Sequence, residues 1–113
     1  MVTAETAVVL PVLLLVLAGA VAAVTVVGGQ LRCVDAAREG ARAAARGESV
    51  AVVTRLAGRA APDGATVSVE EDGDEVRVTV AAVVAPLGPV PLEVTVEAEA
   101  VALREPGAPE PAG

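Results

Sequence analysis

Residues 1–29, MVTAETAVVLPVLLLVLAGAVAAVTVVGG, decide the fold of this chain. No formal charge occurs between Glu5 and Arg32. Residues 7–27 are long enough to cross a bilayer as a helix, which takes roughly 20 residues at about 1.5 Å each. Pro11 lies inside this stretch and predicts a kink near its N-terminal end. The sequence therefore predicts a membrane-spanning helix.

Small residues give this helix a face on which another helix can pack. Gly19 and Ala23 lie one helical turn apart, and such a pair lets a second helix approach closely. A cleaved secretory signal peptide is the alternative, because residues 20–22 (AVA) resemble a cleavage site. Against it, Glu5 stands where a signal peptide carries positive charge, and the apolar run continues past residue 22. We therefore favour an uncleaved helix.

The helical pattern continues after Gly29 as QLRCVDAAREGARAAARGE. Two rows of small residues recur at every fourth position: Ala36, Gly40 and Ala44, and beside them Ala37, Ala41 and Ala45. They predict a smooth face on which another helix can pack closely. Arg38, Arg42 and Arg46 form a third row, which contacts phospholipid headgroups or the acidic surface of a partner, or is simply a solvated face. Gly47 predicts that the helix ends near Arg46.

A second, shorter helix is predicted at residues 49–61, SVAVVTRLAGRAA. Its amphipathic pattern places five side chains toward the core: Val50, Val53, Leu56, Ala57 and Ala60. Arg55 and Arg59 fall on the opposite face. Pro62, Asp63 and Gly64 then break the helix.

The rest of the chain alternates with period two, which is typical of half-buried antiparallel strands. The predicted strands are ATVSVE (65–70), EVRVTV (75–80) and LEVTVEAEA (92–100). Their inward side chains are Val67 and Val69; Val76, Val78 and Val80; and Leu92, Val94, Val96 and Ala98. Asp72 and Gly73 signal a hairpin between the first two strands.

The predicted fold class is α+β: a long N-terminal transmembrane helix that extends beyond the membrane, a short second helix and a three-stranded antiparallel sheet. Four segments follow from it. Residues 1–31 form the transmembrane and assembly helix, and residues 32–47 continue it outside the membrane. Residues 48–103 form a small α+β domain, and residues 104–113, rich in Pro and Gly, form a disordered tail.

Composition argues against catalysis. The 113 residues include no His, no aromatic residue and one cysteine, Cys33. No nucleophile–base pair, zinc site or phosphate loop can be assembled from them, so we expect no enzyme, no cofactor and no metal. The acidic run EEDGDE (70–75) does not match the spacing of an EF-hand, and a hairpin tip explains it without calcium. Cys33 is either a site of acylation or cross-linking or, as we favour, a small buried thiol.

The net charge of −7 is unevenly distributed. Six Arg and four acidic residues precede Pro62, whereas two Arg and eleven acidic residues follow it. An acidic distal half without aromatic residues argues against a nucleic-acid partner. The mildly basic half adjoins the apolar run, where anionic headgroups could lie.

Two stretches resemble a known family. VTAETAVVLPVLLLVL (2–17) and AAREGARAAARGE (36–48) are similar to the TadE-like minor pilins of tight-adherence (Flp) pili, a branch of the type IV pilin-like proteins. The resemblance is close over roughly the first 48 residues. It implies a non-enzymatic pilin or pseudopilin, which is held in the bacterial cell membrane by one helix and has its C-terminal domain outside the cytoplasm. Its implied partners are the membrane and other pilins.

The family also implies how the N-terminus is made. Such proteins carry a basic leader ending in Gly, which a prepilin peptidase removes, and the fifth residue of the mature chain is Glu. If Met1 is the first mature residue, Glu5 falls on this position. The resemblance then implies that Glu5 pairs with the N-terminal amine of a neighbouring subunit during assembly.

Electrostatics gives the pairing of Glu5 separate support. A carboxylate drawn into the membrane edge costs about 2–3 kcal/mol, so it favours a cation. The nearest basic side chain is Arg32, which leaves the α-amine of another copy as a partner. The alternative is an exposed acid in the first turn, stabilised by the helix dipole.

Charge also bears on topology. Arg32, Arg38, Arg42 and Arg46 all follow the apolar run, and no basic residue precedes it. The positive-inside rule alone therefore places the C-terminal domain in the cytoplasm, whereas a basic leader before Met1 restores the opposite orientation. The alternative function is a single-pass anchor that presents a small acidic domain and is unrelated to pili.

Overall fold

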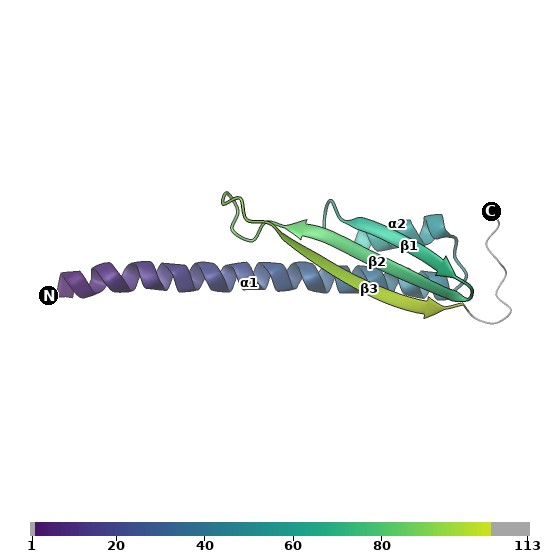
Figure 1. The fold of residues 1–113 in the computed structure, drawn as a ribbon, viewed down its shortest axis with the longest axis horizontal. Helices are drawn as coiled ribbons and strands as arrows, with labels where there is room; N and C mark the ends of the chain where they lie inside the picture. Colours follow the sequence, from purple (N-terminus) through teal and green to yellow (C-terminus); the bar gives the residue numbers. More distant parts are fainter. Residues whose placement is uncertain (1, 105–113) are drawn as a thin grey trace.

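The computed structural model describes residues 2–104 as two helices and one sheet (Figure 1). The elements are α1 (Val2–Ala45), α2 (Val50–Ala60), β1 (Thr66–Asp72), β2 (Glu75–Val84) and β3 (Val94–Leu103). The sheet is antiparallel with strand order β1-β2-β3, which confirms the predicted α+β fold. Met1 and the predicted tail from residue 105 onward lie outside the described residues.

Helix α1 contains 44 residues and is continuous through Pro11. Figure 1 shows no sharp kink at its N-terminal end, where the sequence predicted one. Pro11 removes a single backbone hydrogen bond, and the Leu-rich turns that follow favour the helix strongly enough to carry it onward. The N-terminal half of α1 therefore projects from the rest of the molecule as one rod.

The predicted end of α1 is confirmed. Gly47 adopts φ 85, a left-handed conformation that glycine takes without a steric penalty. Its N–H donates to the Ala44 carbonyl at 3.0 Å, and the Glu48 N–H donates to the Ala43 carbonyl at 3.1 Å. These two bonds form a Schellman motif, which satisfies the last carbonyls of the helix and turns the chain back.

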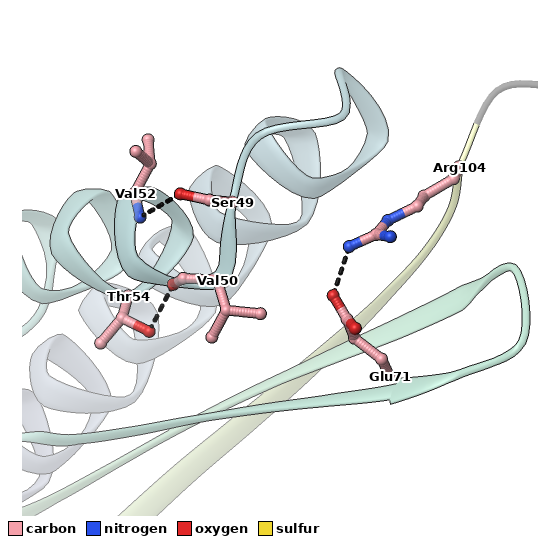
Figure 2. A network of polar contacts seen from close by, with 6 residues as sticks. All are labelled: Ser49, Val50, Val52, Thr54, Glu71 and Arg104. Atoms are coloured by element: carbon pink, nitrogen blue, oxygen red, sulfur yellow. Dashed lines mark hydrogen bonds and ion pairs between the residues drawn. The ribbon is translucent and has the colours of Figure 1, made fainter. Parts of the chain in front are cut away.

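Helix α2 begins after Ser49, whose hydroxyl accepts a hydrogen bond from the Val52 N–H at 3.3 Å (Figure 2). Val53 and Ala57 are buried against the core, and Leu56 packs beside them. Val50 was predicted to face inward, but it is 41% exposed. It is the first residue of α2.

The sheet keeps the predicted alternation. Val76, Val78 and Val80 of β2 are fully buried, while Arg77 between them is exposed. Gly73 and Asp74 connect β1 to β2, and Gly73 takes φ 63 at the first loop position, as a two-residue hairpin of this kind requires. The turn thus lies one residue later than the Asp72–Gly73 signal.

Strand β3 starts later than predicted. It begins at Val94, and Leu92, which was expected to face inward, is 46% exposed. The Leu92 N–H donates to the Val90 carbonyl at 2.7 Å, so this part of the chain bonds to itself rather than to β2. At its other end β3 continues to Leu103, where the sheet extends past the predicted limit.

The core lies between one face of the sheet and the C-terminal half of α1, with α2 alongside (Figure 1). The small-residue rows of α1 form the helix side of this core. A Cβ on Gly40 would lie 2.9 Å from Val78 Cγ1 and 3.2 Å from Ala57 Cβ. Small side chains on the helix therefore let the strand and α2 approach it closely, which compensates for the absence of large core residues.

Candidate functional site

The N-terminal half of α1 is an apolar surface that the rest of the chain leaves uncovered. Leu and Val side chains from Val8 to Leu31 remain between 50% and 74% exposed on most of its faces. An exposed apolar surface of this extent indicates an interaction with a membrane or another protein. Among the described residues, α1 is the one helix long and apolar enough to cross a membrane, judged by length and composition.

Glu5 lies in the first turn of this helix and is exposed. Because α1 is continuous, Arg32 is about 40 Å away along the helix axis, at about 1.5 Å per residue. The basic side chains of residues 2–104 therefore offer Glu5 no partner within the same subunit. Met1, whose amine is the predicted partner in a neighbouring copy, lies outside the described residues.

The predicted helix-packing residues fall into two groups. Gly19 and Ala23 are exposed in the uncovered half, and nothing lies within 4 Å of the position that a Cβ on Gly19 would occupy. Ala36, Gly40 and Ala44 are buried in the core of their own subunit. Their packing partners in this structure are the sheet and α2, so Gly19 and Ala23 are the small residues that remain open to a second helix.

Arg38, Arg42 and Arg46 are all exposed, and Arg42 pairs with Glu39 at 3.7 Å. Their height above the membrane follows from the helix. Arg42 lies about 22 Å beyond Val27 along the axis, and Arg38 about 16 Å. The polar headgroup region is only about 5–8 Å deep on each side, so Arg42 and Arg46 are out of its reach. Solvent or a protein partner is therefore the better fit for them.

Gln30 joins the two halves of the molecule, and sequence reasoning missed it. Its side-chain Nε2 donates to the Glu97 carbonyl at 2.8 Å, and the Glu97 N–H donates to Gln30 Oε1 at 3.2 Å. The side-chain amide thus makes the two hydrogen bonds to the Glu97 backbone that a neighbouring strand would make at the open edge of β3. Next to it, a Cβ on Gly29 would lie 2.8 Å from Val84 Cγ2, so Gly29 allows the sheet to reach the helix. The available signal was a lone amide at the end of the apolar run.

Cys33 is fully buried in the core. Burial raises the pKa of its thiol above the usual range, and the nearby Arg32 guanidinium opposes this only in part. A buried, protonated thiol is a poor nucleophile and is not accessible to an acyl donor or to a second copy. The structure thus places Cys33 as the small buried thiol that we favoured.

Two arginines form ion pairs at and beside the acidic hairpin. Arg104 donates to Glu71 across the end of the sheet (Figure 2). Its backbone N–H also donates to the Asp74 carbonyl at 2.9 Å. Arg104 therefore belongs to the ordered part of the chain, although we assigned it to the tail. Arg77 pairs with Glu99 at 3.0 Å. Within residues 2–104 no three His, Cys, Asp or Glu side chains are grouped to hold a metal ion.

Comparison with known proteins connects these features to a family. The family model for TadE-like proteins matches residues 1–42, which is most of α1. Apoptosis inhibitor Rv3655c of Mycobacterium tuberculosis (strain ATCC 25618 / H37Rv) is 44% identical over 103 residues, covering 91% of this chain and 78% of that protein. The chain belongs to the TadE-like family. No solved structure matches it.

Membership gives the uncovered helix a context. TadE-like proteins are associated with the Tad (tight-adherence) pilus, and this family is generally non-enzymatic. This TadE-like protein is therefore a Tad pilus-associated subunit, and within residues 2–104 it has one helix long and apolar enough to span a membrane. The matched residues hold Glu5, the Gly19–Ala23 pair and most of the helix face that packs under the sheet.

Proposed function

We propose that this TadE-like protein is a minor pilin or pseudopilin, which is stored in the bacterial membrane and assembles through the N-terminal half of α1. The observation that carries the proposal is the uncovered apolar rod with one carboxylate at its start. In the membrane, lipid covers this surface. In a filament or its assembly platform, the apolar helices of other pilins replace the lipid, and Gly19 and Ala23 allow them close approach.

Glu5 sets the axial register in this proposal. A carboxylate and an α-amine about 4 Å apart gain roughly 4 kcal/mol at an effective dielectric constant of 20, before the desolvation cost is subtracted. The distance to Arg32 leaves this interaction open to an incoming subunit. Because the pair forms only when two N-termini lie at matching heights, it selects one stagger between neighbouring helices.

Replacing Glu5 tests this role. We expect Glu5→Ala and Glu5→Gln to insert into the membrane normally and to co-purify with other Tad pilins about tenfold less than the unchanged protein, since tenfold corresponds to about 1.4 kcal/mol. Glu48→Gln, an acid outside the membrane segment, is the matched control and should co-purify normally. Unchanged co-purification of both Glu5 variants would refute the assembly role.

The orientation and the processing of the N-terminus belong to the same proposal. We place the C-terminal domain outside the cytoplasm, with Met1 as the first residue after a prepilin peptidase has removed a leader. Protease added to spheroplasts should then digest the domain, whereas a cytoplasmic domain would be protected. N-terminal sequencing of the protein from its native membrane should begin at Met1, and a longer uncut extension would count against the pairing of Glu5.

A further inference from the structure

The connection between β2 and β3, residues 85–93, points toward the membrane. β2 touches α1 at two levels: Val78 lies against Gly40, and Val84 lies against Gly29. The strand therefore runs antiparallel to α1, in the direction of the apolar half. The chain beyond Val84 continues along that direction, and Figure 1 shows the loop beside the middle of α1, on the N-terminal side of the sheet.

The height of this loop brings it to the level of the bilayer. Gly29 is two residues past Val27, where the apolar segment ends, which is about 3 Å along the helix axis. The loop leaves Val84 and returns at its partner Val94, and Figure 1 shows it extending from these strand ends further toward the N-terminus of α1. Val26 packs against the core and Ala22, one turn earlier, is also half-buried, whereas Val21, Val24 and Val27 are exposed. The covered face of α1 therefore continues past Gly29 in the direction of the loop.

The composition of the loop suits an apolar medium. Residues 85–92, APLGPVPL, carry no charge, and the sequence becomes acidic again only at Glu93. Val90 is 50% exposed and Leu92 is 46% exposed, whereas Pro86 is buried and Leu87 is half-buried. In water, the exposed parts of these two apolar side chains contribute no hydrophobic stabilisation. At the boundary of headgroups and acyl chains they would be covered.

The backbone of the loop also has few N–H groups that need water as a hydrogen-bond partner. Pro86, Pro89 and Pro91 have no N–H that would need a partner. The Val90 N–H donates to the Leu87 carbonyl at 3.3 Å in a turn that begins at Leu87 and has Gly88, with φ 57, as its second residue. The Leu92 N–H is satisfied by the Val90 carbonyl. Few donors are thus left exposed, which lowers the main cost of moving an irregular segment into a membrane interface.

We propose that residues 86–92 form a second membrane contact, in which Val90 and Leu92 insert among the acyl chains at the edge of the leaflet that α1 leaves. Interfacial segments of this kind reach about 5–10 Å below the headgroup boundary. One helix alone leaves a domain free to turn about the helix axis. A second contact, offset from the axis, fixes which side of the domain faces the membrane and which faces an incoming subunit.

A fluorescence experiment tests the contact, and the composition of the chain makes it clean. The protein has no aromatic residue, so a single introduced Trp is the only fluorophore of its kind. Val90→Trp places it in the loop. Val101→Trp is the matched control, because Val101 is 49% exposed, like Val90, but lies near the far end of β3. Both full-length proteins are placed singly in lipid nanodiscs whose scaffold protein contains no Trp, with ordinary or acyl-brominated lipids.

We expect Val90→Trp to emit at shorter wavelength and to be quenched roughly twofold or more by brominated lipid, while Val101→Trp stays solvent-like and unquenched. Equal, unquenched emission from both would overturn the proposal. A blue shift that appears only when several copies share a disc would also overturn it, because the loop would then contact a neighbouring subunit.

The unmodified protein supplies a second measurement, in case Trp itself draws the loop into the lipid. In the same nanodiscs, doxyl-labelled lipid should broaden the backbone amide signals of Val90 and Leu92 and leave that of Val101 sharp. A water-soluble paramagnetic agent should do the reverse. Sharp Val90 and Leu92 signals with the labelled lipid would show that the loop stays in water and would refute the contact.

Discussion

At the scale of single residues, Gly40 shows how a core made of Ala and Val reaches tight packing. A Cβ at this position would lie 2.9 Å from Val78 Cγ1, closer than carbon atoms normally approach. Val78 is itself fully buried and has no free space to move into. The glycine is therefore a packing requirement of α1, despite its weak preference for helices.

Replacing two helical glycines should give opposite results. We expect Gly40→Ala to lower the free energy of unfolding by about 1–3 kcal/mol, because the new methyl group forces the strand or α2 away. Gly58→Ala, in α2, meets nothing within 4 Å and should raise it by about 0.5–1 kcal/mol through helix propensity. Denaturant unfolding in detergent, followed by circular dichroism, measures both. Equal effects of the two substitutions would contradict this view of the core.

Because the Cys33 thiol is buried, we expect the free energy of unfolding to depend on pH. Burial raises the pKa of its thiol in the folded protein, so the folded state keeps the proton to higher pH than the unfolded chain does. The contribution to stability is complete below the unfolded pKa of about 8.5 and is lost as the pH rises through the folded pKa. Between pH 7 and pH 10, the unchanged protein should therefore lose more stability than Cys33→Ala does.

Labelling with a thiol reagent provides the control for this prediction. At pH 8 the folded protein should react at least about tenfold more slowly than the denatured protein, because the thiol becomes accessible only after local opening. Prompt labelling of the folded protein would show that Cys33 is accessible and would reopen acylation or cross-linking.

At the scale of elements, the link between α1 and β3 depends on Gln30. Its side chain makes two hydrogen bonds to the backbone of Glu97, at 2.8 and 3.2 Å, where β3 has no neighbouring strand. An open strand edge invites pairing with another chain, and this amide blocks part of it. Gln30 also fixes the sheet to the helix at the end of the apolar segment.

We expect Gln30→Ala to leave the Glu97 N–H and carbonyl without their hydrogen bonds to the Gln30 side chain. Hydrogen exchange of the Glu97 amide should accelerate about tenfold, which corresponds to roughly 1.4 kcal/mol and is in the range of one to two exposed hydrogen bonds. The amide of Val78, in the centre of the sheet, serves as the internal control and should exchange as before. No change at Glu97 would mean that water replaces the Gln30 amide without cost.

The elements themselves were predictable from the sequence, because each depends on local pattern. Alternation placed Val76, Val78 and Val80 inward, and Gly47 ended α1 where the structure ends it. Leu92 continued the alternation of β3 and still lies in a loop, since Pro91 and the bond from Leu92 to Val90 end the ladder. The turn chemistry of a Pro-rich loop thus outweighed its hydrophobic pattern.

The contacts between elements were harder to predict, because they join residues far apart in the chain. Gln30 and Glu97 are separated by 67 positions, and nothing local marks them as a pair. The small-residue rows were ambiguous for a different reason. Periodicity shows that Ala36, Gly40 and Ala44 share a face, but a partner helix and the chain's own sheet require the same small residues there. Only the three-dimensional structure shows that the sheet packs on this face of α1.

At the scale of the whole molecule, α1 belongs to two environments at once. The protein measures 77 × 21 × 18 Å, and one helix runs along most of its length (Figure 1). Its first half is uncovered, and its second half contributes buried residues to the core: Cys33, Ala36, Ala37, Ala41, Ala43 and Ala44. The apolar segment and the domain therefore share one continuous helix.

This sharing of α1 predicts where the chain can be cut. Residues 28–104 retain the core-forming half of the helix together with Gly29 and Gln30, and we expect them to fold and unfold cooperatively in water. Residues 48–104 lack that half. Val76, Val78 and Val80 would then lose their cover, at about 1–2 kcal/mol each, and a sheet of three strands with only α2 beside it cannot compensate. Circular dichroism melting and amide signal dispersion distinguish the two fragments. A cooperative transition in residues 48–104 would show that the α+β segment is a domain in its own right and that α1 merely rests on it.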